Sequence, residues 1–153
     1  FDPFLSDKKA DELGVEKCEL GELFARAFVV SNHLANNEQT KGMLHYDHFC
    51  RMRENAVLIN TGRGAQVVEE DLVRVLRERS DLTALLDVTY PEPPADDHPF
   101  YTLPNCLLTP HIAGSAGDEL ARMGEYMLGE CKDYLDGEPC KYEVSMKMLE
   151  TMA

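Results

Sequence analysis

Short apolar runs alternate with helical segments along most of this chain, and this alternation is the feature that most restricts its possible folds. Four runs rich in β-branched or aliphatic residues are typical of buried parallel strands: 27–30, 56–59, 84–86 and 106–108. Helices are expected around them at 20–26, 46–52 and 69–79. The order αβαβαβ with a last strand predicts an α/β fold, in which helices joined by right-handed crossovers cover a parallel sheet.

Two of the helical segments have clear signals at their ends. Segment 69–79 begins with acidic residues and ends with arginines, which complements the helix dipole. Over Asp118–Leu135, apolar residues recur on one helical face, and Gly137 follows as a stop. This second helix is long for the end of such a sheet, so we expect it and the tail 138–153 to pack on something outside this chain.

Composition and charge exclude several classes of protein. The 153 residues are 44% hydrophobic and 28% charged, which fits one folded domain rather than a disordered or collagen-like chain. No stretch offers the roughly 20 apolar residues of a membrane span, and the start lacks a signal-peptide pattern. A net charge of -13 at pH 7 repels phosphate backbones and anionic lipids. We therefore expect a cytoplasmic protein with no nucleic-acid or membrane partner.

The cysteines and histidines give no sign of a metal site. Five cysteines are widely spaced and form no Cys-x-x-Cys pair, which indicates reduced thiols. His45, His48 and Cys50 bring nitrogen and sulfur donors together, but no fourth ligand has the spacing of a closed site. We therefore expect neither a disulfide framework nor a bound metal.

Three polar segments come directly after predicted strands, at the sheet edge where open α/β folds bind ligands. The first places Arg63 between two glycines, where a guanidinium can take a carboxylate through two parallel hydrogen bonds. The second runs from Asp87, at a strand end, to Glu92, which lies between prolines; the third fixes His111 after Pro110. Taken singly, such an arginine is usually a surface ion-pair partner and such a glutamate is usually solvated. Their common position at strand ends makes them a candidate site.

Together these segments resemble the D-isomer-specific 2-hydroxyacid dehydrogenase family, which has an Ile-Asn-Thr-x-Arg-Gly, an Asp-Val-x-x-x-Glu-Pro and a Thr-Pro-His segment. The similarity runs from about Phe1 through Tyr142. It implies that residues 1–117 are the second half of a Rossmann-type doubly wound parallel sheet that binds NAD. Residues 118–153 would be a long C-terminal helix and tail returning to a substrate domain. Because the glycine-rich phosphate motif would lie about 20 residues before Asp2, we expect a C-terminal portion of such an enzyme.

The resemblance also implies roles for the three catalytic candidates. Arg63 would bind the carboxylate and carbonyl of a 2-keto acid, Glu92 would orient His111, and His111 would exchange a proton with the substrate oxygen. A protonated imidazole beside a developing oxyanion accelerates such steps by about 10²–10⁴-fold, and a neighbouring carboxylate favours the protonated ring. The expected reaction is the reversible reduction of a 2-keto acid to a D-2-hydroxy acid, with NAD as the cofactor.

Cofactor contacts are implied by the same resemblance. Asp2 would accept hydrogen bonds from the adenosine ribose and repel a 2′-phosphate, which favours NAD over NADP. Asp87 would lie near the nicotinamide carboxamide, unless it instead caps the turn that follows it. The remaining residues assigned to the cofactor are Asn60, Thr61, Gly62 and Gly114.

A second class of function and two structural expectations complete the sequence-based interpretation. The same fold serves in this family as a corepressor, so a non-catalytic, dinucleotide-dependent interaction protein is the alternative. A half-sheet and an unpartnered helix would expose apolar surface, and the family resemblance implies dimers, so we expect a homodimer or other self-association. Because their strands should be neighbours, Glu92 and His111 are expected within direct or one-water hydrogen-bond reach.

Overall fold

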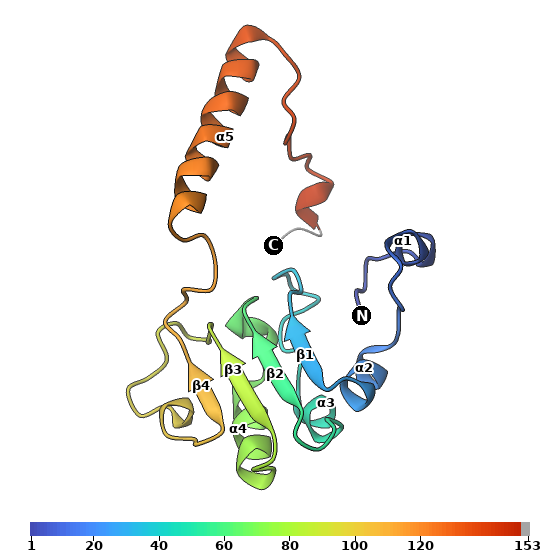
Figure 1. Ribbon diagram of the computed structural model, residues 1–153, viewed down its shortest axis with the longest axis vertical. Coiled ribbons are helices and arrows are strands. Elements are labelled where there is room, and N and C mark those ends of the chain that lie inside the picture. Colours follow the sequence, from blue (N-terminus) through green and yellow to red (C-terminus); the bar gives the residue numbers. More distant parts are fainter. Residues whose placement is uncertain (151–153) are drawn as a thin grey trace.

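Four parallel strands form one sheet in the computed structural model, which describes residues 1–150 (Figure 1). The strands lie side by side in chain order: β1 (Val29–Asn32), β2 (Val57–Asn60), β3 (Thr83–Leu86) and β4 (Cys106–Leu108). The register aligns Asn32 with Asn60 and Asn60 with Leu86, so the carboxyl ends of the strands share one edge. The predicted α/β fold with a parallel sheet is confirmed.

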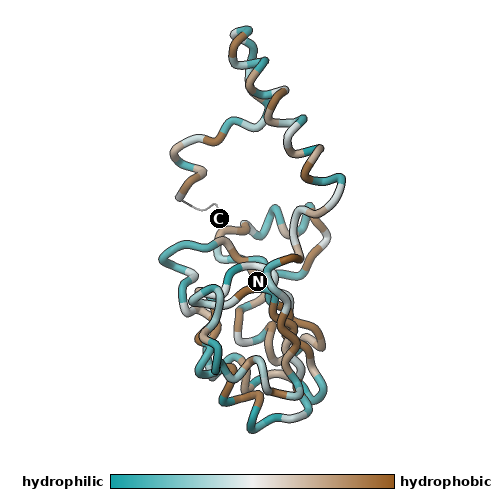
Figure 2. The backbone as a smooth tube through the Cα atoms, turned by 90° about the vertical axis from the view of Figure 1, so that its left-hand side faces the viewer, coloured by the Kyte–Doolittle hydropathy of each residue, from teal (hydrophilic) through white to brown (hydrophobic). Residues whose placement is uncertain are grey.

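Three helices supply the other half of the core: α2 (Leu20–Arg26), α3 (Tyr46–Cys50) and α4 (Glu69–Glu78). Phe24, Phe49 and Leu72 of these helices pack with Leu58 and Ala84 of the sheet in one buried cluster. Figure 2 shows many apolar segments in this part of the chain, and others along the C-terminal helix and tail. Strand residues alternate between buried and partly exposed, because the helices of the core lie on one face of the sheet. The strands, predicted as buried runs, therefore have one well covered face.

The ends of several elements differ from the predicted ones. Strand β1 begins at Val29 rather than residue 27, because the amide of Ala27 closes α2 by bonding to the Leu23 carbonyl. Helices α3 and α4 end slightly before the predicted residues, and Arg79 caps α4. Two single-turn 3-10 helices, η1 (Gly64–Gln66) and η2 (Pro99–Tyr101), lie in the connections after β2 and β3.

Helix α1 (Asp7–Leu13) is not predicted by the apolar pattern, because only Ala10 of its seven residues is buried. Its ends nevertheless carry ordinary local signals. Ser6 accepts a hydrogen bond from the Lys9 amide at the N-cap, and Gly14 closes the helix with a φ of 66° in the left-handed region. In the sequence, only the capping residues Ser6 and Gly14 indicate this short helix.

Helix α5 (Asp118–Asp136) rises away from the sheet (Figure 1) and ends at Gly137, as predicted. None of its residues is buried, and Leu128 and Leu135 are 73% and 76% exposed. The following chain returns beside the helix, since the Glu130 carboxylate accepts hydrogen bonds from backbone amides of the tail at 3.0 and 3.3 Å. The short helix η3 (Met148–Glu150) ends the described part.

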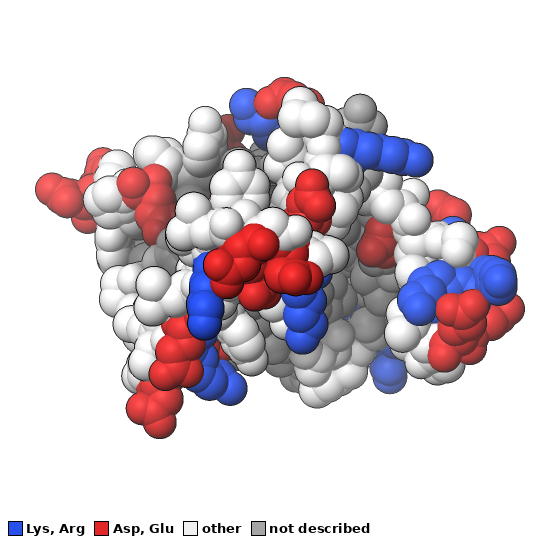
Figure 3. Space-filling view, turned by 90° about the horizontal axis from the view of Figure 1, so that it is seen from above, with Lys and Arg blue, Asp and Glu red and all other residues white. Residues whose placement is uncertain are grey.

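The surface reflects the acidic composition of the chain. Seen from above in Figure 3, acidic side chains gather at several places, with basic side chains mostly beside them. Across residues 1–150, no helix has the length and hydropathy that crossing a membrane would require.

Candidate active site at the carboxyl edge of the sheet

Two cavities lie beside segments that follow the strands. The Asp2 cavity, of about 430 Å³, is lined by residues 1–4, by α2 and by the turn after β1. The His111 cavity, of about 480 Å³, is lined by the segments that follow β3 and β4, including Asp87, Glu92 and His111. Tyr101, from η2, also lines it. The sheet therefore brings three of the predicted site residues into one cavity.

His111 and Glu92 form a direct hydrogen bond in the His111 cavity. The His111 Nδ1 lies 2.6 Å from Glu92 Oε1, and the two side chains are 45% and 40% exposed. Their expected proximity is confirmed. The contact leaves Nε2, the other ring nitrogen, without a hydrogen-bond partner in the described part of the chain. A histidine held at Nδ1 by a carboxylate can exchange a proton through Nε2.

The backbone of His111 is held in an uncommon conformation. Its φ is 53°, in the left-handed region that non-glycine residues adopt at a cost in energy. The His111 amide donates to the Asp87 carbonyl at 3.0 Å, which ties the end of β3 to the loop after β4. The fold therefore fixes where this imidazole lies.

Asp87 stabilises the same loop through its carboxylate. The amides of Ile112 and Ala113 each donate to it at 2.8 Å, one to each oxygen, and the Thr109 hydroxyl donates to Oδ1. Asp87 is only 5% exposed. Burial opposes its charge, but these three hydrogen bonds together hold the pKa of Asp87 below its ordinary value. Asp87 thus caps the loop after β4, and its contact with a nicotinamide stays a prediction.

The loop after β2 holds Arg63 outside both cavities. Arg63 is exposed, and its guanidinium donates to the Gly62 carbonyl at 2.8 Å. The Asn60 side chain is buried and spans this loop, accepting from the Gly62 amide at 3.1 Å and donating to the Arg63 carbonyl at 3.2 Å. Asn60 therefore orders the loop. Thr61 and Gly62 are half-buried, and Gly114 lies in open surroundings.

Gly64 lets the Arg63 loop lie directly against the segment that leads to Glu92. A Cβ at Gly64 would overlap the carbonyl group of Thr89, closer than real Cβ atoms approach other atoms. Only glycine permits this approach of two backbones. Gly64 thus allows a contact between two strand-end segments.

Glu69 supports the segment that leads to Glu92, a contact that sequence reasoning missed. Its carboxylate accepts the Tyr90 amide at 2.7 Å and lies 3.4 Å from the Nε2 of His98. Burial raises the pKa of Glu69, although the hydrogen bond from Tyr90 opposes this effect. Its acidic character at the start of α4 was visible in the sequence, but its link to the Glu92 segment depends on the fold.

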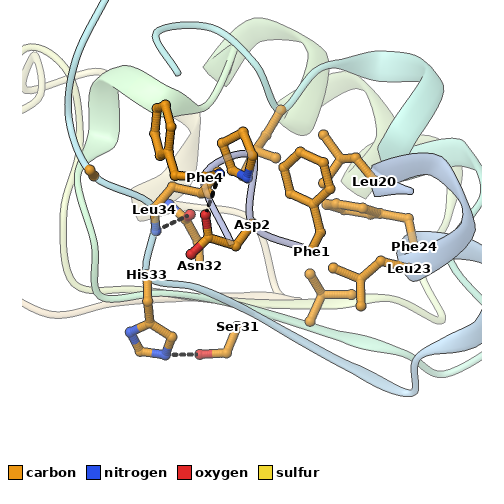
Figure 4. A pocket seen from close by; sticks show the side chains of 14 residues that line it. Phe1, Asp2, Phe4, Leu20, Leu23, Phe24, Ser31, Asn32, His33 and Leu34 are labelled. Carbon is orange, nitrogen blue, oxygen red and sulfur yellow. Dashed lines mark hydrogen bonds between the residues drawn. The ribbon is translucent and has the colours of Figure 1, made fainter. Parts of the chain in front are cut away.

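The Asp2 cavity has the chemistry of a nucleoside pocket. Asp2 Oδ1 accepts the amides of Phe4 and Leu5 at 2.7 and 3.2 Å, and among described residues Oδ2 has no donor. Figure 4 shows Asp2 beside the turn that follows β1, with Phe1 and the apolar side chains of α2 also lining the cavity. Apolar walls can hold a base while a carboxylate accepts ribose hydroxyls, so these residues fit the adenosine part of a dinucleotide.

The histidines of α3 serve local structure. The amide of His45 donates to the Nδ1 of His48 at 3.4 Å, and their rings lie 4.2 Å apart. Burial of the His48 ring lowers its pKa. Within residues 1–150, no three metal-ligating side chains gather as a potential site, and all five cysteines are free thiols.

Comparison with known proteins identifies the family of this chain. Residues 1–113 match the model of the D-isomer specific 2-hydroxyacid dehydrogenase, NAD binding domain. The chain belongs to this family. The protein YoaD of Bacillus subtilis is 40% identical over 116 residues, covering 75% of this chain and 33% of YoaD. The human glyoxylate reductase/hydroxypyruvate reductase is 32% identical, covering 91% of this chain and 42% of the human enzyme.

Solved structures agree with the family. The crystal structure of a D-isomer specific 2-hydroxyacid dehydrogenase from Polaromonas superposes with a TM-score of 0.77 at 27% identity, over 92% of this chain and 44% of that chain. The TT0316 protein from Thermus thermophilus superposes with a TM-score of 0.76 at 37% identity, over 86% of this chain and 42% of that chain. The recognition of an NAD-binding domain is thus confirmed. The chain spans about a third of the length of the curated relatives it matches.

Proposed function

We propose that this chain carries the cofactor-binding and proton-transfer part of an NAD-dependent enzyme that interconverts 2-keto acids and D-2-hydroxy acids. The hydrogen bond of 2.6 Å between His111 and Glu92 carries this proposal. It couples an imidazole and a carboxylate in a cavity at the carboxyl edge of the sheet, which is where open α/β folds bind ligands. Membership of the family supports the same reaction.

The residues divide the chemical work. NADH, when bound, supplies the hydride that reduces the keto carbon. His111, protonated on both nitrogens, gives the Nε2 proton to the substrate oxygen as charge develops there, and its neutral ring takes that proton back in the reverse reaction. Glu92 accepts from Nδ1 throughout, which fixes the orientation of the ring. Arg63 binds the carboxylate, for which its guanidinium turns away from the Gly62 carbonyl.

Residues that line the two cavities would hold the cofactor. Asp2 would accept the ribose hydroxyls of NAD and repel a 2′-phosphate, while the apolar side of the Asp2 cavity would hold the adenine. Asn60, Thr61, Gly62, Asp87 and Gly114 are assigned to the remaining cofactor contacts. For Asn60 and Asp87 this role would be exerted through the loops they order.

Assembly, location and domain division belong to the same proposal. Residues 1–117 would form part of the NAD-binding domain, and 118–153 would return to a substrate domain. The exposed apolar residues of α5 support a homodimer or other self-association, and free thiols fit a cytoplasmic protein. Light scattering at micromolar concentration tests the assembly, and a monodisperse monomer would contradict it.

The decisive experiment measures NADH oxidation by the full-length protein with pyruvate, glyoxylate and hydroxypyruvate, followed by chiral analysis of the product. His111→Asn is expected to lower kcat by about 10²–10⁴-fold with little change in NADH affinity. The matched control is His45→Asn, because His45 is outside both cavities and asparagine also serves well at a helix N-cap. No turnover with any 2-keto acid, or full activity in His111→Asn, would refute the proposed enzyme and favour a dinucleotide-dependent interaction protein.

A further inference from the structure

Three amide side chains form a buried cluster at the carboxyl ends of β1 and β2. Asn32 closes β1, Asn60 closes β2, and Gln66 ends η1. They are 4%, 1% and 0% exposed. We call these three residues the amide cluster. A buried amide costs free energy unless its donors and acceptors are satisfied, so the partners of this cluster show what its side chains hold in place.

The carbonyl side of Gln66 faces the loop that carries Arg63. Gln66 Oε1 accepts from the Asn32 Nδ2 and, at 3.4 Å, from the Arg63 amide. Asn32 Nδ2 also donates to Asn60 Oδ1 at 3.0 Å, and Asn60 in turn bonds to the backbone of the same loop. The cluster therefore reaches the Arg63 loop by two routes.

The amide nitrogen of Gln66 faces the turn that lines the Asp2 cavity. Gln66 Nε2 donates to the carbonyls of Leu34 and Ala35 at 2.6 and 3.0 Å. Both residues line the Asp2 cavity. Asn32 Oδ1 adds a bond from the Leu34 amide at 3.2 Å. One buried side chain thus joins a wall of one cavity to the loop of the arginine.

The packing leaves this arrangement little freedom. A Cβ at Gly62 would lie 3.1 Å from Asn32 Nδ2 and 3.2 Å from Gln66 Oε1, so the Arg63 loop rests directly on the cluster. The backbone of Gln66 is fixed as well, because its carbonyl accepts the Leu44 amide at 2.9 Å. Every hydrogen bond of the Gln66 side chain goes to Asn32, to the Arg63 loop or to the 34–35 turn, and none within the described chain goes elsewhere in the core.

We propose that Gln66 is a positioning residue that sets the Arg63 loop, residues 61–63, relative to the 34–35 turn of the Asp2 cavity. Through it, the carboxylate-binding arginine and the wall proposed to hold the adenosine keep a fixed mutual geometry. The effect on catalysis rests on the proposed function of Arg63, whereas the structural link between the two segments does not.

The first experiment measures amide hydrogen exchange in the 153-residue chain, without any ligand. Gln66→Leu removes both sides of the link and is expected to raise exchange in residues 34–36 and 61–63 together, by roughly 3- to 10-fold for each lost bond. Gln66→Glu keeps the acceptor oxygen and loses the donor, so it should loosen residues 34–36 more than 61–63. The control Val75→Ala weakens the core at a residue that is 0% exposed. It should not raise exchange in these two segments more than in the rest of the sheet body.

The second experiment separates positioning from stability in the full-length protein. Gln66→Leu lowers Tm as well as breaking the link, so Val75→Ala, which weakens the core without touching the amide cluster, serves as the control for lost stability. A positioning role predicts that KM for the 2-keto acid is raised by roughly 3- to 10-fold in Gln66→Leu but not in Val75→Ala, while kcat changes less.

Each outcome decides the proposal. Raised exchange in both segments of Gln66→Leu, with a KM defect that Val75→Ala does not share, supports it. Exchange that rises in one segment or in neither in Gln66→Leu, or an equal rise of KM in Val75→Ala, overturns it. If the wild-type protein reduces no 2-keto acid, the proposed function fails, and the exchange experiment still decides whether Gln66 links the two segments.

Discussion

The sheet body, residues 20–113, and the terminal arm, residues 118–150, differ in how their apolar side chains are used. In the sheet body, three helices and four strands share one buried core. In the arm, a 19-residue helix with clear end signals has no buried residue. Both regions therefore form the secondary structure that their local sequence favours, but only the sheet body packs its apolar residues in a buried core.

This difference predicts how much each region contributes to the stability of the folded chain. Isolated helices gain most of their stability from tertiary packing rather than from intrinsic propensity. The arm is held within the described chain by its own helical bonds and by a few contacts, such as the Tyr126 and Tyr142 rings 6.0 Å apart. The free energy of unfolding should thus depend on the sheet body, and the site residues all lie in it or beside it.

The largest expected effect comes from making one substitution in both regions. Leu72→Ala, at a residue 1% exposed, should lower the free energy of unfolding by about 2–5 kcal/mol, because it leaves a cavity in the core. In the unassociated chain, Leu128→Ala, at a residue 73% exposed, should change it by less than about 0.5 kcal/mol. Urea denaturation measures both. Equal losses would show that Leu128 packs on a partner in solution.

A smaller effect on stability and activity is expected at Gly64, where the Arg63 loop contacts Thr89. Gly64→Ala would force the Arg63 loop away from Thr89, which should cost about 1–3 kcal/mol and reduce kcat/KM in the full-length protein. Gly124→Ala, in α5 and outside both cavities, is the control, since nothing described lies within 4 Å of the added methyl group. Thermal unfolding with steady-state kinetics checks the pair. A Gly64→Ala protein with wild-type stability and activity would disprove the close approach.

Within the arm, two glycines should respond in opposite directions. Gly137→Ala places a side chain at a φ of 74° and should weaken the end of α5 by about 1 kcal/mol, whereas Gly129→Ala, inside the helix, should strengthen it by about 0.5–1 kcal/mol. The rates of amide hydrogen exchange across residues 130–137 measure both effects. The urea midpoint of the sheet body should stay constant, and a shift there would mean that the two regions unfold together.

The smallest effect is a pH dependence in the sheet body. Because burial raises the pKa of Glu69 above its ordinary 4.5, the folded state holds its proton more tightly than the unfolded state. This contribution to stability is complete below pH 4.5 and is lost as pH rises through the folded pKa. Glu69→Gln, which keeps an acceptor for the Tyr90 amide, should remove that decline in urea midpoints measured from about pH 4 to 7. The exposed Glu70→Gln serves as control, and an unchanged decline in Glu69→Gln would contradict the assignment.

Local sequence was enough for the main elements and for part of the site. Apolar periodicity and end signals predicted α2, α4, α5 and the existence of all four strands, because these features depend on neighbours within a few residues. Polar residues after successive strands predicted a common edge, and the contact of His111 with Glu92 followed from the neighbouring strands. Helix α1 escaped this reasoning because it has almost no apolar face.

Only the tertiary structure decided which side chains hold the site. Asp87 reaches amides 25 and 26 positions away, Gln66 reaches Asn32 across 34 positions, and Gly64 meets Thr89 through backbone contact. No local pattern marks such pairs, because each depends on strand order and on the register that sets two loops side by side. The sequence by itself determined the elements and the chemistry available at their ends. The packing of parallel strands decided which of those groups meet, since hydrogen bonds and close contacts act only over a few ångströms.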